Sequence, residues 1–203
     1  MSLFLEKGYT ATSTADICEA AHINKPTLYL FFKNKRHLFF LCHMESLESL
    51  LQPYLEKANS VKDPSKRLKF MIQEFTKMIC QNPELKVLIH ETMSTKDQYF
   101  KIVRDIWKKH YELLRDTIAE LKDKRILLTK LPSSRAALFL LGMMTWITFW
   151  FDYEKKESID EVVDTALSFG LRGLSVRKAS MATPRTSCSQ GQWDGQASES
   201  LKK

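Results

Sequence analysis

The fold of this chain is decided by residues 16–35, which read DICEAAHINKPTLYLFFKNK. Ser13 or Thr12 can cap a first short helix, and residues 22–24 then form a tight turn. A second short helix starts near Pro26, which is allowed there because an N–H in the first helical turn has no partner in any case. Two short helices joined by a turn are typical of the helix-turn-helix, which places its second helix in a DNA major groove.

The second short helix separates an inner from an outer face. Leu28 and Phe32 are four residues apart, so they predict the buried face. The outer face is left with Lys25, Thr27, Tyr29, Leu30, Lys33 and Lys35. A largely polar and basic face following a helix-turn-helix pattern favours contact with nucleic acid over plain exposure to solvent.

The first forty residues resemble the N-terminal domain of a known family. GYTATS at 8–13, DI at 16–17 and KPTLYLFFKNK at 25–35 are together similar to the TetR family of transcriptional regulators. The resemblance implies an all-α fold, with an N-terminal three-helix helix-turn-helix domain followed by a helical ligand-binding and dimerisation domain. Beyond these residues the chain is similar to the family only in its length and in the order of its helices.

The resemblance also implies which residues bind DNA, and we expect these to be Thr12, Ser13, Lys25, Pro26, Thr27, Tyr29, Leu30 and Lys35. Thr27, Tyr29 and Lys35 match positions that commonly contact phosphates in the family. The others match positions that approach bases, or lie at a helix N-terminus, where N–H groups favour a phosphate. Lys33 and Arg36 are either further contacts or plain surface charge.

Two departures from the family pattern concern this N-terminal part. Members usually carry a longer first helix, whereas only residues 2–7 precede Gly8 here. We therefore expect a shortened first helix and a DNA-binding part that is less stable than the rest. Position 22, commonly glycine at the turn, is His22. An alternative function follows, namely a helical ligand- or partner-binding module that has lost DNA binding through the shortened first helix.

The remainder of the chain predicts further helices and no sheet, because apolar residues recur with a helical period and never alternate. Caps and prolines place these helices at about 35–59 with an interruption at Pro53, and at about 64–81, 83–90, 97–122, 134–152 and 159–174. We therefore predict a DNA-binding domain at 1–40 and a helical effector-binding and dimerisation domain at 41–175. Residues 176–203, rich in Ser, Gly, Gln and charge, predict a disordered tail.

Aromatic and methionine side chains of the second domain have two interpretations. They either fill a helical core or line an effector cavity between helices, where bundles often bind ligands. The core is the commoner role for any one residue, but the family resemblance implies a pocket for a small, largely apolar effector. Its candidate lining is Phe75, Tyr99, Trp107, Tyr111, Met143 and Trp146.

The last two helices predict a homodimer. Residues 136–151 are too apolar for the outside of a monomer, and a second copy would cover them, although a deep intramolecular core is the alternative. The candidate interface residues are Leu138, Leu141, Val163, Leu167 and Leu171. Two copies would place their second short helices in successive major grooves, about 34–36 Å apart, on a near-palindromic operator.

Composition and motifs argue against other classes of protein. The net charge of +7 favours an acidic partner such as double-stranded DNA. The histidines and cysteines lack metal-ligand or catalytic spacing, so we expect no enzyme, no catalytic residue, no metal and no cofactor. His90-Glu91 as an acid–base pair and Cys80 as a redox sensor are less common roles than surface lining and a buried thiol. The longest apolar run is too short for a bilayer, so we expect a cytoplasmic protein with no membrane contact.

Overall fold

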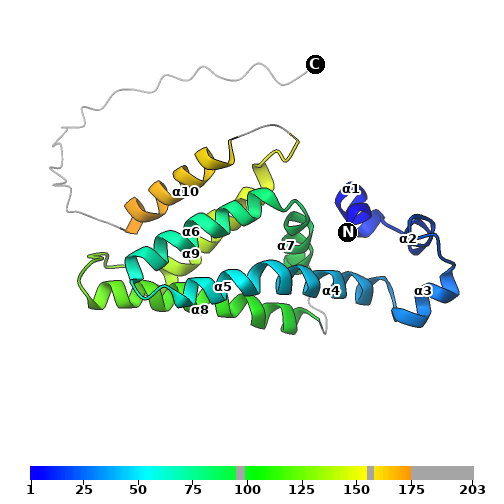
Figure 1. The fold of residues 1–203 in the computed structure, drawn as a ribbon, viewed down its shortest axis with the longest axis horizontal. Coiled ribbons are helices and arrows are strands. Elements are labelled where there is room, and N and C mark those ends of the chain that lie inside the picture. The colour runs from blue at the N-terminus through cyan, green and yellow to red at the C-terminus, as the bar shows by residue number, and fades with distance from the viewer. Residues whose placement is uncertain (95–98, 155–157, 175–203) are drawn as a thin grey trace, which may run out of the picture.

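The computed structural model describes residues 1–94, 99–154 and 158–174 (Figure 1). Within these ranges the chain forms ten α-helices and one π-helix and contains no strand, which confirms the predicted all-α fold. The tail predicted at 176–203 lies outside the described residues. None of the described helices is both long and apolar enough to cross a membrane.

Three short helices form what we call the head, at one end of the molecule (Figure 1). They are α1 (Ser2–Ala11), α2 (Thr14–Ala20) and α3 (Lys25–Phe31). Gly8 interrupts α1 with φ 76° and ψ 164°, a conformation that is open essentially only to glycine. The first helix therefore bends sharply at Gly8 and then continues for one more turn. Phe4 is buried against the rings of Tyr9 and Phe39 and anchors α1 to the helix that follows the head.

Side-chain caps fix where α2 and α3 begin. Ser13 Oγ accepts the backbone N–H of Asp16 at 3.1 Å, and the Asp16 carboxylate accepts the N–H of Ser13 at 2.7 Å, which is a capping box. Asn24 Oδ1 accepts the N–H of Thr27 at 2.8 Å and starts α3 in the same way. These caps specify a short helix, a turn and a second short helix, as predicted.

The turn between α2 and α3 is a Schellman motif with His22 in a left-handed conformation, at φ 53°. The N–H of Ile23 donates to the carbonyl of Cys18, and that of His22 donates to the carbonyl of Glu19. A non-glycine residue occupies this conformation at a cost of about 1 kcal/mol. His22 therefore forms the same tight turn that glycine usually forms at this position, but the folded chain is less stable as a result.

A long helical segment connects the head to the rest of the chain. It consists of α4 (Lys35–Ser46), a π-helix (Leu47–Leu51) and α5 (Gln52–Ser60). Asn34 caps α4 through the N–H of His37. Pro53 lies in the first turn of α5, where its missing N–H would break a regular helical ladder, and the π-helix directly precedes it. The interruption predicted near Pro53 takes this form.

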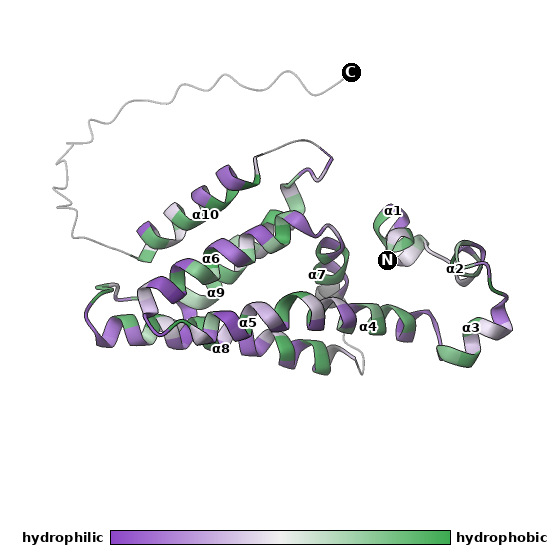
Figure 2. Cartoon of the chain, viewed as in Figure 1, coloured by the Kyte–Doolittle hydropathy of each residue, from purple (hydrophilic) through white to green (hydrophobic). Residues whose placement is uncertain are grey.

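The remaining helices form what we call the body. They are α6 (Pro64–Gln81), α7 (Glu84–Ser94), α8 (Phe100–Asp123), α9 (Ser133–Trp150) and α10 (Ile159–Leu174). The central helix is α6, which packs against α5, α8, α9 and α10 and buries Met71, Ile72, Phe75 and Ile79. Hydrophilic and hydrophobic residues alternate along α10, as expected of a helix with one buried face (Figure 2). α7 contacts both α1 and α9, so it connects the head to α9.

Candidate nucleic-acid interface and effector region

The outward face of α3 collects most of the side chains predicted to approach DNA. Leu28 is only 4% exposed and anchors the inner face, whereas Leu30 is 80% exposed. Lys25, Pro26 and Tyr29 are also exposed. The structure thus brings these four predicted residues onto one accessible surface.

Phe31 belongs to the same exposed end of α3 and was missing from the predicted set. It is 70% exposed, next to Leu30. Figure 2 shows α3 changing from hydrophilic at its N-terminal end to hydrophobic at its C-terminal end. Phe31 is three residues from Leu28, a spacing that favours the inner face, so no signal in the sequence predicted its exposure.

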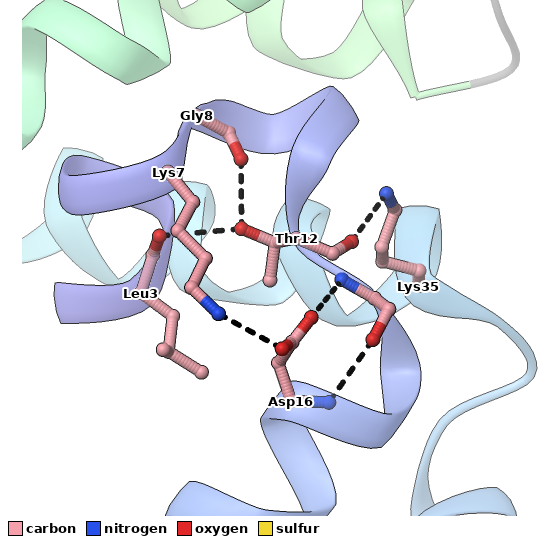
Figure 3. A network of polar contacts seen from close by, with 7 residues as sticks. Leu3, Lys7, Gly8, Thr12, Asp16 and Lys35 are labelled. Carbon is pink, nitrogen blue, oxygen red and sulfur yellow. Dashed lines mark hydrogen bonds and ion pairs between the residues drawn. The ribbon is translucent and has the colours of Figure 1, made fainter.

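Thr12 was predicted to contact DNA, and the structure contradicts this. Thr12 is fully buried, and its hydroxyl donates to the carbonyl of Gly8 at 2.7 Å and lies 3.2 Å from that of Leu3 (Figure 3). It therefore ties the two parts of bent α1 together. Ser13, by contrast, is exposed and uses its oxygen as an acceptor, which leaves its hydroxyl hydrogen for a phosphate.

Thr27 also differs from the prediction. Its hydroxyl donates to Asn24 Oδ1 at 2.7 Å, the same atom that accepts its backbone N–H. A phosphate oxygen is an acceptor and needs a donor. The hydrogen of the Thr27 hydroxyl is committed to the cap, so this geometry does not favour the predicted phosphate contact.

Lys35 has the most marked departure, because its ammonium group binds the end of α1. Nζ donates to the carbonyl of Thr12 at 2.7 Å (Figure 3). It also donates to the carbonyl of Tyr9 at 2.8 Å, with that of Thr10 at 3.4 Å. It also lies 4.4 Å from the centre of the Tyr9 ring. A cation beside the last carbonyls of a helix satisfies acceptors that lack partners and complements the helix dipole. In this structure Lys35 holds α1 against α4 instead of pointing to solvent.

Lys7 and Asp16 form the second polar link inside the head. Their Nζ and Oδ1 atoms are 2.8 Å apart (Figure 3). The Lys7 ammonium, together with the Ser13 hydroxyl and N–H, holds the pKa of the Asp16 carboxyl well below its usual range. The charge of Lys7 is thus balanced locally, whereas Lys25 and Lys33 project from the head as exposed cations.

The six residues predicted to line a pocket lie in three separate places. Phe75, Trp107 and Tyr111 belong to the packing between α6 and α8, and Phe75 lies 6.0 Å from Trp107 between ring centres. Tyr99 stacks on Phe40 of α4 at 4.4 Å, so it joins the body to the helix leaving the head. Met143 and Trp146 line a groove on the outside of α9 and α10. A single pocket made of all six is therefore wrong.

A buried polar group that was not predicted lies between α6 and α8. His110 is fully buried, with Nε2 2.9 Å from the hydroxyl of Tyr54 and its ring 4.5 Å from that of Phe75. Burial lowers the pKa of His110 to about 3 and raises that of Tyr54. Among the described residues, His110 Nδ1 and the buried Thr76 hydroxyl have no hydrogen-bond partner. Unpaired buried polar atoms are costly, so a polar atom of a bound molecule would be stabilised here.

The outer surfaces of α9 and α10 form an apolar groove of about 1260 Å³. Its large exposed side chains are Phe139, Trp146, Trp150 and Phe169. Of the predicted interface residues, Leu138 is exposed and Leu141 is partly so. Val163, Leu167 and Leu171 instead pack against the core of their own chain, because that face of α10 covers α6. The predicted helices have an exposed apolar surface, but on α10 the exposed residues lie on the other face.

Two consecutive residues of α7, His90 and Glu91, contact α9 and α4, respectively. Arg36, in the first turn of α4, forms an ion pair with Glu91. His90 Nε2 lies 3.0 Å from the hydroxyl of Thr148, and its ring stacks on Phe149 at 3.9 Å. No group of three His, Cys, Asp or Glu side chains suited to a metal ion occurs in the described part of the chain.

Two family models match this chain. The one described as bacterial regulatory proteins, tetR family, matches residues 1–42, and the one described as Tetracyclin repressor-like, C-terminal domain, matches residues 61–174. Among curated proteins, the chain is similar to the uncharacterized HTH-type transcriptional regulator YhgD of Bacillus subtilis (strain 168). The two are 36% identical over 166 residues, which is 75% of this chain and 79% of YhgD.

Solved structures share the fold. The TetR family transcriptional regulator PfmR from Thermus thermophilus superposes with a TM-score of 0.75 and 25% identity, over 85% of this chain and 94% of PfmR. AibR, in complex with isovaleryl coenzyme A and operator DNA, gives a TM-score of 0.75 at 20% identity, over 83% of this chain and 91% of AibR.

Proposed function

This chain belongs to the tetR family of bacterial regulatory proteins, and from that premise we propose that it is a ligand-responsive repressor. It binds a near-palindromic operator as a homodimer and leaves it when a small, largely apolar effector binds the body. The observation that carries the proposal is the exposed face of α3 on a capped, tightly turned pair of short helices. The family is one of regulators and not a class of enzymes.

The DNA contacts in this proposal follow the exposed groups of the head. α3 enters the major groove, while Lys25, Lys33, Tyr29 and Ser13 bind phosphates around it, since each has an exposed side chain with a donor. Lys35 acts indirectly, by holding α1 against α4. We retain the division into a DNA-binding domain at 1–40 and an effector and dimerisation domain at 41–175 as part of the proposal. The protein would meet its operator in the cytoplasm.

The dimer in this proposal forms through the outer surfaces of α9 and α10. Phe139, Trp146 and Phe169 would be covered by the same surface of a second copy, which removes a large apolar patch from water. Leu138 is exposed on α9 but does not line the groove, so its predicted role stays a prediction. Val163, Leu167 and Leu171 support this surface from beneath.

The effector in this proposal binds between α6 and α8, beside His110. Apolar rings surround this point, and His110 Nδ1 supplies a buried polar atom that lacks a protein partner. AibR shares the fold and was solved with isovaleryl coenzyme A, so acyl-coenzyme A thioesters are the first class to test, with their apolar acyl group beside His110 and their charged coenzyme A part outside this buried site. An effector releases DNA only if it binds the two conformations with different affinity. Contacts of α7 with the head and with α9 provide the connection.

A selection experiment tests the function. The full chain is used to enrich duplexes from a random pool, and the affinity for the enriched duplex is compared with that for a scrambled one. We expect a near-palindromic site bound at least about 10³-fold more tightly than the scrambled duplex. Isovaleryl-coenzyme A and longer acyl thioesters are then added in turn, with free coenzyme A as the control. Failure to enrich any sequence would contradict the proposal and would favour the helical module that has lost DNA binding.

A further inference from the structure

The outward face of α3 is centred on two residues without any hydrogen-bonding group. Successive residues of an α-helix are about 100° apart, so Pro26 and Leu30 lie one turn from each other and opposite the buried Leu28. Both are exposed, and Leu30 is the more exposed of the two leucines of this helix at 80%. The centre of the surface that would meet a base pair is therefore apolar.

Hydrogen-bonding groups lie only at the flanks of this surface. Lys25 and Tyr29 stand on one side of the apolar centre, and the hydroxyl hydrogen of Thr27 on the other is committed to Asn24. α3 contains no Arg, Asn, Gln, Asp or Glu, the side chains that, with lysine, most often pair with guanine, adenine or cytosine edges. Within α3, only Lys25 and Tyr29 could donate hydrogen bonds to DNA, and the proposed function assigns both to phosphates.

The major groove displays one apolar feature that distinguishes bases, the C5-methyl group of thymine. We propose that α3 recognises its DNA site through thymine methyl groups, with Leu30 and Pro26 as specificity-determining residues. The inference rests on the proposed function, because it concerns the same face of α3. Most of the Leu30 side chain is exposed to water. Contact with a thymine methyl group would therefore bury apolar surface of both partners.

The size of the effect follows from the burial of a methyl group. Each buried methylene- or methyl-sized group corresponds to about fourfold in affinity. A single thymine-to-uracil replacement removes only the methyl group and leaves every hydrogen-bonding group in place. It therefore separates methyl recognition from polar recognition and from the phosphate contacts, which are unchanged.

The experiment uses the full chain and the duplex enriched by selection. Each thymine of one half-site is replaced by uracil in turn, and the dissociation constant is measured at fixed salt. We expect a loss of about fourfold at one or two positions and none elsewhere. Leu30→Ala should bind the thymine duplex more weakly and lose its preference for thymine over uracil at one of these positions. Leu128→Ala, which removes an equally apolar and exposed leucine outside the head, should retain the preference.

The outcomes separate this inference from the function it rests on. If no duplex is enriched, both fall. If a duplex is enriched but uracil replaces thymine at every half-site position without loss, only methyl recognition is overturned. Retention of the thymine preference by folded Leu30→Ala overturns the role of Leu30. The uracil series uses the unmutated chain. It therefore tests methyl recognition even if Leu30→Ala folds poorly.

Discussion

Arg36, in the first turn of α4 directly after the head, forms an ion pair with Glu91 of α7 in the body, with Nη1 and Oε1 3.3 Å apart. Both side chains are largely buried. The residue before Glu91, His90, contacts Thr148 and Phe149 of α9. A displacement of α7 therefore changes its contacts with α1, α4 and α9 together.

Removal of the charge of Glu91 should loosen the head. Glu91→Gln loses the ion pair with Arg36, whose value in this partly buried setting is about 1 kcal/mol. We expect amides of residues 1–46 to exchange about fivefold faster with solvent hydrogen, with little change in α6 or α10. Glu112→Gln removes the partner of Lys108 in an exposed pair and serves as the control. Equal exchange in the two variants would show that the Arg36–Glu91 pair does not restrain the head.

Alanine variants of Lys35 and Lys33 should have different effects, the first on the stability of the head and the second on DNA binding. Lys35→Ala leaves the carbonyls of Tyr9 and Thr12 without their charged donor, so we expect the head to lose about 1.5–3 kcal/mol. Lys33→Ala should leave thermal unfolding unchanged and should flatten the slope of log affinity against log salt by about 0.9. Both quantities are measured for both variants. A stable Lys35→Ala chain with a flattened salt slope would restore the phosphate contact to Lys35.

Phe169 should be essential to the dimer. Phe169→Glu places a charge in the apolar groove of α10, where burial without a partner is unfavourable, so light scattering should give the mass of one chain. Leu128→Glu is the matched control, because Leu128 and Phe169 are both 71% exposed and only Phe169 lines the groove. A Phe169→Glu chain of twice the monomer mass would place the interface elsewhere.

Stability should fall as the pH drops below about 6.5, because two histidines are buried in uncharged form. Burial lowers the pKa of His110 to about 3, and burial with the nearby charge of Arg36 lowers that of His43 to about 4. The unfolded chain binds a proton at each near pH 6.5, whereas the folded chain does not. The free energy of unfolding is thus highest above pH 6.5 and falls by about 1.4 kcal/mol per pH unit for each histidine toward pH 4.

Urea unfolding at pH 5 and pH 6 measures this slope. His110→Gln should reduce the dependence by the contribution of one histidine, whatever its effect on absolute stability. An unchanged slope in His110→Gln would mean that His110 takes up its proton in the folded chain.

Most helices were predictable because their signals are local. Ser13, Asn34 and Asp63 each accept a hydrogen bond from an N–H three residues later, and such caps are visible in the sequence. Periodicity then gives the angle between residues on a helix. It does not say whether an apolar face meets its own chain or another copy, so Leu167 and Phe169 of α10 could not be assigned to their proper sides.

Site residues were harder to predict, because their partners are distant in sequence. Lys35 follows the recognition helix, where a phosphate contact and a link to α1 are equally consistent with a basic residue. The choice depends on the carbonyls of residues 9–12, which the fold brings beside it. Likewise, His110 looks like any isolated histidine until α6 and α5 place Phe75 and Tyr54 around it.

The π-helix between α4 and α5 determines where the chain tolerates a change of length. Ala58 follows Phe39 by nineteen residues, whereas five turns of α-helix take about eighteen, yet both side chains are buried. The wide turn at Leu47–Leu51 absorbs the additional residue. Deleting one residue there would reduce the spacing of Phe39 and Ala58 to about the eighteen residues of five regular turns and keep their buried faces aligned. The same deletion within α4 would turn the head by about 100° relative to the body.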